Sequence, residues 1–81
     1  MVVELVLYSR LGCHLCEQMQ AELAELGAEL AFALRVEDVD RNAAWRAAYG
    51  NEIPVLTTVD GREICRHVLD PGALRAYLAA R

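Results

Sequence analysis

The apolar pattern changes its period at Gly12-Cys13, and this change constrains the fold more than any other feature of the sequence. Val2–Tyr8 is a short apolar run rich in β-branched residues, which predicts a mostly buried strand. From Cys13 onward, apolar residues recur at helical spacing until Gly27, which is the predicted stop of the helix. The predicted buried face of this helix consists of Leu15, Met19, Leu23 and Leu26. The chain is therefore expected to open with a strand that leads into an amphipathic helix.

A second strand and a short helix are predicted next. Leu30–Val36 (LAFALRV) has the apolar content of a strand, although its alanines also suit a helix. Because a long helical crossover joins parallel strands, this strand is expected to run parallel to the first. Asp40 is the predicted N-cap of a short helix that continues through Tyr49 and ends at Gly50. The buried side of this short helix is predicted to consist of Trp45, Ala48 and Tyr49.

The last third of the chain has the pattern of a β-hairpin followed by a helix. Val55–Val59, introduced by Ile53-Pro54, is predicted as the third strand. Asp60-Gly61 is a strong signal for a two-residue hairpin turn, which makes Arg62–Leu69 a fourth strand, antiparallel to the third. Asp70-Pro71 combines an N-cap with a proline at the first helical position. The inner face of this terminal helix is predicted to consist of Leu74, Tyr77 and Leu78.

These elements give the order β-α-β-α-β-β-α, an α/β fold with one mixed four-stranded sheet flanked by three helices. With 81 residues, the chain is expected to form a single domain over residues 1–81. Its net charge is −4 and its basic residues, all arginines, form no stripe, which argues against a nucleic-acid partner. No segment resembles a signal peptide or approaches the roughly 20 apolar residues of a membrane span. We therefore expect a cytoplasmic monomer with no membrane partner.

Two cysteines stand at the junction between the first strand and the first helix. Residues i and i+3 of a helix have Cβ atoms roughly 5–6 Å apart, and a disulfide needs about 3.5–4.5 Å, so a small adjustment allows Cys13 and Cys16 to bond. The electropositive N-terminus of the helix favours the thiolate of Cys13. Arg10 would add positive charge nearby, and Gly12 leaves room for a partner sulfur. The pair therefore predicts thiol–disulfide exchange in which Cys13 attacks and Cys16 resolves the mixed disulfide.

The same residues resemble the active-site segment of glutaredoxins in the thioredoxin superfamily. Tyr8–Cys16 (YSRLGCHLC) is similar to the family's Y-S-K-x-x-C-P-Y-C, and Glu52–Val55 (EIPV) stands where that family has a T-V-P loop. Asp60-Gly61 lies in the expected hairpin, and the order of elements matches along nearly the whole chain. The resemblance is to the short bacterial glutaredoxin-like proteins. It implies a thioredoxin-like fold and a dithiol oxidoreductase, with no bound cofactor, that reduces disulfides of proteins or of glutathione-type small molecules.

The resemblance also implies roles for individual residues. Cys13 would be the nucleophile and Cys16 the resolving thiol. Arg10 would replace the basic residue that helps activate the thiolate and binds a carboxylate of glutathione. Pro54 would be a cis proline beside the thiols, and Ile53 would pair with an extended substrate through its backbone N–H and C=O.

Two departures from the family pattern bear on the substrate. The central dipeptide is His14-Leu15 instead of Pro-Tyr, so these residues are candidates for contacting the substrate, with His14 either solvated or tuning Cys13. Val68-Leu69 stands where the family has a Gly-Gly pair that lets the backbone approach glutathione. Glutathione is therefore a candidate reductant that the sequence disfavours, and a reductase of the thioredoxin-reductase type is the other candidate.

A non-catalytic or metal-binding interaction domain is the alternative to an oxidoreductase. Zinc is one candidate metal, although a C-x-x-C followed by a distant C-x-H is not a usual zinc spacing. An iron–sulfur cluster held between two chains is the other. Cys65 itself is expected to be a small apolar strand residue, with a regulatory thiol or a second resolving cysteine as its alternative role. The four candidate zinc ligands are Cys13, Cys16, Cys65 and His67.

Overall fold

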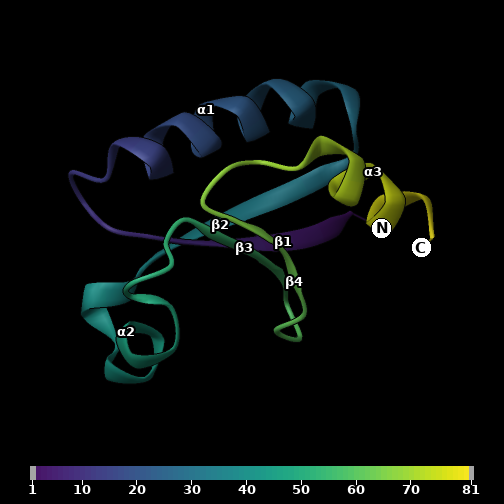
Figure 1. The fold of residues 1–81 in the computed structure, drawn as a ribbon. Helices are drawn as coiled ribbons and strands as arrows, with labels where there is room; N and C mark the ends of the chain where they lie inside the picture. Colours follow the sequence, from purple (N-terminus) through teal and green to yellow (C-terminus); the bar gives the residue numbers. More distant parts are fainter. Residues whose placement is uncertain (1, 81) are drawn as a thin grey trace.

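A computed structural model describes residues 2–80 of the chain. Within that range, the order of strands and α-helices is the predicted β-α-β-α-β-β-α, with one short 3-10 helix added before the second α-helix. Figure 1 shows the chain coloured along its length. The elements are β1 (Val3–Ser9), α1 (His14–Glu29), β2 (Phe32–Asp38), η1 (Val39–Arg41), α2 (Ala43–Tyr49), β3 (Val55–Thr58), β4 (Glu63–Arg66) and α3 (Pro71–Ala79).

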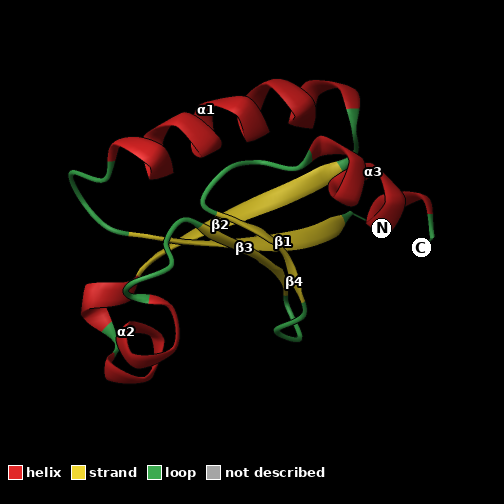
Figure 2. Ribbon diagram, in the orientation of Figure 1, coloured by secondary structure: helices red, strands yellow, loops and turns green. Residues whose placement is uncertain are grey.

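The strands form one mixed sheet in the order β2-β1-β3-β4. β1 pairs in parallel with β2 from Val3↔Phe32 to Ser9↔Asp38, as expected for strands joined by a helix. β3 is antiparallel to both β1 and β4. Helices α1 and α3 cover one face of the sheet, and α2 lies on the other face (Figures 1 and 2). This arrangement confirms the predicted thioredoxin-like α/β fold.

The main core lies between the sheet and the helix layer of α1 and α3. Alternate side chains of β1 point into it because successive residues of a strand face opposite sides. Leu5 and Leu7 are both fully buried, and burying a leucine contributes roughly 1.5–3 kcal/mol. This packing holds α1 across β1, so the start of α1 lies just beyond the end of β1 (Figure 1). The core residues are Leu5, Leu7, Met19, Leu23, Leu56, Cys65 and Leu74.

The first helix has its N-terminus at Cys13, the N-cap, as predicted, but its C-terminal end and its buried face differ from the prediction. Gly27 does not stop α1, which continues to Glu29. A Cβ at Gly27 would lie 3.7 Å from the ring of Phe32, so the helix and β2 approach closely there, and β2 begins two residues later than predicted. Leu15 is 45% exposed and does not belong to the buried face. Cys16 takes that place, so the buried residues of α1 are Cys16, Met19 and Leu23.

The segment around α2 also differs from its prediction. Asn42, not Asp40, caps α2, because its side chain accepts from the backbone N–H groups of Ala44 and Trp45. Asp40 lies inside η1. Gly50 ends α2 as predicted. The predicted buried side is only half-buried, since no residue of α2 is fully buried and Ala48 is exposed.

The aromatic residues of α2 pack against the end of β1. The ring of Tyr49 stacks on Tyr8 with 4.4 Å between centroids, and the ring of Trp45 meets Tyr8 edge-on at 5.5 Å. Such pairs contribute about 0.5–1.5 kcal/mol beyond the area that they bury. They attach α2 to the sheet at Tyr8, next to the loop that carries the cysteines.

The hairpin and the terminal helix follow their prediction, except that both strands are shorter and the predicted two-residue turn at Asp60-Gly61 is wrong by one residue. The N–H of Gly61 donates to the carbonyl of Thr58 at 3.1 Å and Gly61 has φ +90°, so the connection is a three-residue loop with glycine in the left-handed position. β4 ends at Arg66, because the backbone of His67 has φ +68° and leaves the extended region. Asp70 caps α3 and Pro71 is its first residue, as predicted. No helix in the described part of the chain could cross a membrane.

Candidate redox site

Cys13 and Cys16 are joined as a disulfide at the start of α1. Their Cα atoms lie 5.2 Å apart, inside the range of about 4.4–6.8 Å usual for disulfides. Cys13 is the N-cap of α1, and its Sγ accepts a hydrogen bond from the backbone N–H of Cys16 at 3.2 Å. Cys13 is half-buried, whereas only 2% of Cys16 is exposed. A partner sulfur can therefore reach Cys13 more easily than Cys16.

The loop before Cys13 is shaped by a tight turn. The N–H of Cys13 donates to the carbonyl of Arg10 at 3.2 Å. Gly12 has φ +78°, a conformation that a residue with a Cβ rarely adopts, and no heavy atom lies within 4 Å of the position such a Cβ would take. The two residues between the cysteines, His14 and Leu15, both face solvent at the start of α1. Gly12 is thus needed for the turn, and the space beside it is open.

Arg10, which the resemblance implies beside the thiolate, forms an ion pair with Asp40 of η1. Its Nε donates to Asp40 Oδ2 at 2.8 Å and its Nη2 to Asp40 Oδ1 at 3.0 Å. Its Nη1 donates to the carbonyl of Gly50 at 3.4 Å. The hydrogen bond from Arg10 holds the pKa of the Asp40 carboxyl below its usual value, so Asp40 is charged at neutral pH. Asp40, which the sequence suggested only as a helix cap, is therefore the partner of the arginine next to the cysteine loop.

Ile53 and Pro54 are the second segment that the sequence predicts for the site. The Ile53–Pro54 peptide bond is cis, as the family resemblance implied. The carbonyl of Pro54 accepts from the N–H of His67 at 2.8 Å, and Pro54 itself is buried. Ile53 is half-buried, and within residues 2–80 its backbone N–H and C=O form no hydrogen bond. The backbone of Ile53 is thus available for pairing with an extended chain.

A charged network that the sequence did not reveal lies beside this segment. Glu52 accepts from Arg66 Nη1 at 3.0 Å, and its other oxygen lies 3.4 Å from His67 Nε2. Arg66 also pairs with Glu63. His67 adopts a left-handed backbone one residue before Val68, in the loop where glutaredoxins have their glycine pair. The only sequence signal for this left-handed backbone was the absence of the family's Gly-Gly pair. Histidine tolerates the conformation better than most residues.

Cys65 does not join the other cysteines. It is 9% exposed and packs in the main core with Leu56 and Leu74. Burial raises the pKa of its thiol above the usual value. No group of three or more His, Cys, Asp or Glu side chains in the described range 2–80 is arranged to hold a metal ion. The zinc site that would combine Cys65 and His67 with the cysteine pair is therefore not assembled.

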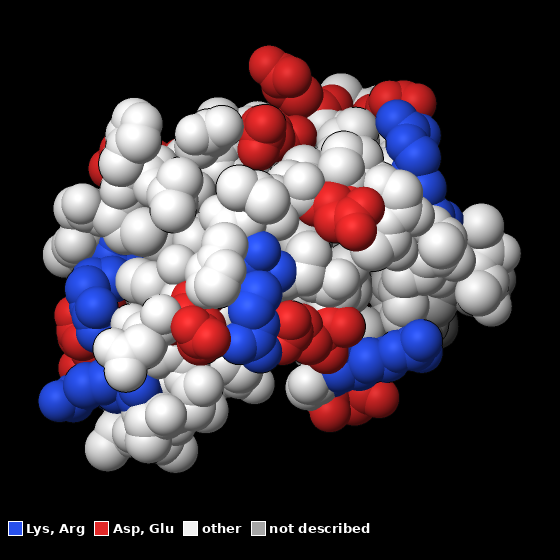
Figure 3. Space-filling model, in the orientation of Figure 1, with Lys and Arg blue, Asp and Glu red and all other residues white. Residues whose placement is uncertain are grey.

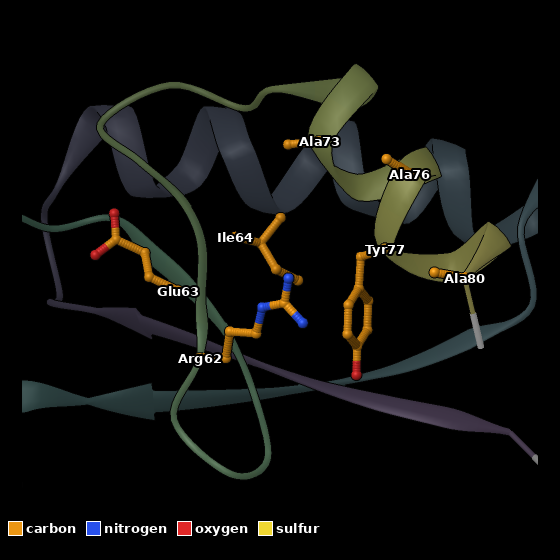
Figure 4. A pocket seen from close by; sticks show the side chains of 7 residues that line it. All are labelled: Arg62, Glu63, Ile64, Ala73, Ala76, Tyr77 and Ala80. Atoms are coloured by element: carbon orange, nitrogen blue, oxygen red, sulfur yellow. The ribbon is translucent and has the colours of Figure 1, made fainter.

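The surface of residues 2–80 includes the following two hollows. The first, of about 280 Å³, lies beside the cysteine loop and reaches Cys16. Its lining residues are Ser9, Arg10, Leu11, Gly12, Cys16, Glu17, Gln20, Val36 and Asp38. The second, of about 230 Å³, lies between β4 and α3, where the guanidinium of Arg62 lies over the ring of Tyr77, 6.0 Å from its centroid (Figure 4). It contains none of the candidate site residues.

Acidic and basic side chains alternate on the face of the molecule shown in Figure 3. Arginines there lie next to carboxylates, and no continuous basic surface is visible. Among the ion pairs of the described residues, Arg66 pairs with both Glu52 and Glu63. Because binding to a phosphate backbone requires a basic patch or stripe, this face gives no support to a nucleic-acid partner.

Sequence comparison finds relatives along most of the chain. The profile of the family described as "Glutaredoxin-like domain (DUF836)" matches residues 4–79. Uncharacterized proteins of Mycobacterium tuberculosis and Mycobacterium bovis are each 38% identical over 78 residues, which covers 90% of this chain and 79% of theirs. The region that matches the family profile, residues 4–79, therefore includes both cysteines and the Ile53-Pro54 segment.

Structural comparison leads to the same group of proteins. An NMR structure of a Nitrosomonas europaea protein is 37% identical, with a TM-score of 0.85 over 95% of this chain and 92% of that one. An X-ray structure of a protein from X. campestris is 40% identical, with a TM-score of 0.75 over 95% and 97%. Thioredoxin 1 of Thermosipho africanus shares the fold at 16% identity, with a TM-score of 0.65 over 95% and 96%. The fold and the cysteine pair at disulfide distance together support a redox-type function.

Proposed function

The chain belongs to the glutaredoxin-like domain family, and on this premise we propose that it is a thiol–disulfide oxidoreductase. Cys13 is its nucleophile and Cys16 its resolving thiol. The observation that carries the proposal is the position of Cys13, which caps α1 and accepts the N–H of Cys16 at 3.2 Å. The competing function is a metal-binding or non-catalytic interaction domain, and no group of three or more His, Cys, Asp or Glu side chains in residues 2–80 supports its metal-binding form.

The surroundings of Cys13 support formation of its thiolate in the reduced protein. A hydrogen bond to a charged group contributes about 1.5–3 kcal/mol, and the end of a helix dipole contributes about 0.3–1 kcal/mol. One unit of pKa corresponds to about 1.4 kcal/mol, so these two effects are large enough to shift thiolate formation by at least one pH unit. Cys13 would then be the more reactive thiol at neutral pH.

The reaction proceeds in two exchanges. The Cys13 thiolate bonds to one sulfur of the substrate disulfide, and the other substrate sulfur leaves as a thiolate that takes up a proton. Cys16 then loses its proton and bonds to Cys13 Sγ, which releases the second substrate sulfur. Two electrons pass from the protein dithiol to the substrate, and the Cys13–Cys16 disulfide is the product. An external thiol reductant returns the pair to its dithiol form.

The backbone of Ile53 would orient an extended substrate beside the cysteine pair. Its N–H and C=O have no partner within residues 2–80, and Pro54 next to it is fixed by the hydrogen bond from His67. Pairing of these two groups with a substrate backbone would form one short β-bridge. A disulfide within an extended protein segment is therefore one substrate class that we propose, and a small-molecule disulfide is the other. Both reactions suit a reducing compartment such as the cytoplasm.

The experiment compares cysteine variants in the reduction of hydroxyethyl disulfide. Cys13→Ser is expected to abolish reduction, because no other thiol is both exposed and activated. Cys16→Ser is expected to accumulate a mixed disulfide on Cys13, detectable by mass spectrometry. Cys65→Ala is the matched control and is expected to turn over like the wild type, since Cys65 lies in the core.

Two results would contradict the proposal. One is full turnover by Cys13→Ser. The other is stoichiometric zinc or iron in protein purified without a chelator, with both Cys13 and Cys16 shielded from alkylation. The second result would favour the metal-binding alternative.

A further inference from the structure

Arg10 is occupied in a way that bears on which disulfides the cysteine site accepts. A guanidinium binds a carboxylate best through two parallel N–H groups. Arg10 uses one such pair, Nε and Nη2, on Asp40, and a third donor, Nη1, on the carbonyl of Gly50. Each edge of the guanidinium that could bind a carboxylate through two donors thus has at least one donor engaged. A carboxylate on a substrate would have to displace Asp40 to bind Arg10 in this manner.

Asp40 is held in place by its own element. The side chain of Asp38 caps η1 and accepts the backbone N–H of Asp40 at 2.9 Å. Val39, the residue before Asp40, has a fully buried side chain, which also fixes the backbone at this point. The backbone of Asp40 is therefore fixed opposite Arg10, and its carboxylate does not depend on a mobile loop to reach the guanidinium.

Apart from Arg10, the charged residues that line the hollow beside the cysteine loop are acidic. The hollow that reaches Cys16 has three charged lining residues, Arg10, Glu17 and Asp38. Because Asp40 already neutralises Arg10, Glu17 and Asp38 determine the sign of the field in this hollow. Charges separated by less than the Debye length, about 10 Å at 0.1 M salt, are only partly screened, so a negative substrate would be repelled and a positive one attracted.

We infer that Asp40 determines the charge preference of the dithiol site, which disfavours disulfides that carry carboxylates and favours neutral or cationic ones. This inference rests on the proposed function. In the reaction, the reduced Cys13–Cys16 pair gives two electrons to the disulfide R–S–S–R, which is released as two R–SH, while the protein becomes the internal disulfide. Asp40 acts as a positioning residue through Arg10 and takes no part in sulfur exchange.

The test measures single-turnover oxidation of the reduced protein by three small disulfides of similar size and different charge. These are cystamine (cationic), hydroxyethyl disulfide (neutral) and dithiodipropionate (anionic). The readout is the rate constant for dithiodipropionate divided by that for hydroxyethyl disulfide at low ionic strength. In Asp40→Asn this ratio is expected to rise at least threefold, a size typical of one exposed ion pair. The ratio for cystamine is expected to fall.

Glu29→Gln is the control variant. It removes the same charge from an ion pair with Arg75 at the other end of α1. If long-range charge alone decided the ratio, both variants would change it equally. Asp40→Ser provides a second test of the same position should the asparagine variant fold poorly.

A double-mutant cycle tests whether Asp40 acts through Arg10. In an Arg10→Gln background, Asp40→Asn is expected to change the ratio by clearly less than in the wild type. An unchanged ratio in Asp40→Asn, an equal change in Glu29→Gln, or an equal effect with and without Arg10 would overturn the inference. None of these results would affect the proposed function, which is tested separately by the reduction of hydroxyethyl disulfide through Cys13 and by the metal content of the purified protein.

Discussion

Three cysteines in this chain have three different surroundings, and these surroundings decide what each can do. Cys13 stands half-exposed at the first turn of α1, where its sulfur accepts a backbone N–H. Cys16 lies one turn further and is almost fully buried. Cys65 is part of the apolar core on β4. Position within the fold, and not residue type, therefore separates a candidate nucleophile from a resolving thiol and a packing residue.

The burial of Cys65 leads to a prediction about its reactivity. Because burial raises the pKa of its thiol, Cys65 stays protonated at pH 8 in the folded protein, and the thiolate is the form that iodoacetamide alkylates. We expect its alkylation at pH 8 to be at least tenfold slower in native oxidised protein than in urea. Peptide mass spectrometry gives both rates. Equal rates would show that Cys65 is not in the core.

The raised pKa of Cys65 also makes the free energy of unfolding depend on pH. A thiol whose pKa is raised by folding stabilises the protein below the pKa of the unfolded chain, and the effect is lost as pH rises through the folded pKa. The free energy of unfolding should therefore decline above about pH 8.5, the ordinary cysteine value. Tyr8, whose pKa is also raised by burial, adds to this decline at higher pH. In Cys65→Ala the decline should be shallower, and an identical pH dependence would contradict the assignment.

At the scale of secondary-structure elements, two glycines offer a matched pair of substitutions. Gly27 lies within α1 with room for a methyl group, so Gly27→Ala should raise the free energy of unfolding by about 0.5–1 kcal/mol. A Cβ at Gly50 would lie 2.5 Å from the backbone oxygen of Arg46, so Gly50→Ala should lower it by about 1–3 kcal/mol. Urea unfolding of both variants provides the measurement. Equal changes in the free energy of unfolding for the two variants would contradict the packing described here around α1 or α2.

The sequence predicted the kinds and order of elements better than their ends. Strong local signals were sufficient for Asp70-Pro71 at the start of α3 and for Gly61 in the hairpin. Gly27 was misread as a stop because glycine often ends helices, whereas here α1 continues through it to Glu29, with room beside Phe32 for a methyl group at Gly27. Asp40 was misread as a cap because Asn42, two residues later, has the same capping chemistry. Such choices depend on tertiary contacts that a local pattern does not contain.

At the scale of the whole molecule, the fold brings together segments that are far apart in the chain. Arg10 and Asp40 are separated by 30 positions, and their contact depends on the parallel pairing of β1 with β2. The contact of His67 with Pro54 likewise depends on the pairing of β3 with β4. The cysteine pair could be found from sequence because it is local. The partners of Arg10 and Glu52 could not, because only the sheet places them side by side.

The central claim is that Cys13, at the N-terminus of α1, forms a thiolate readily, and one measurement tests it most directly. The rate at which iodoacetamide alkylates Cys13 in the reduced protein is followed against pH by peptide mass spectrometry, in native protein and in urea. The midpoint in urea should lie near 8.5, and the native midpoint should lie at least about one pH unit lower. Identical midpoints in the two states would contradict the account.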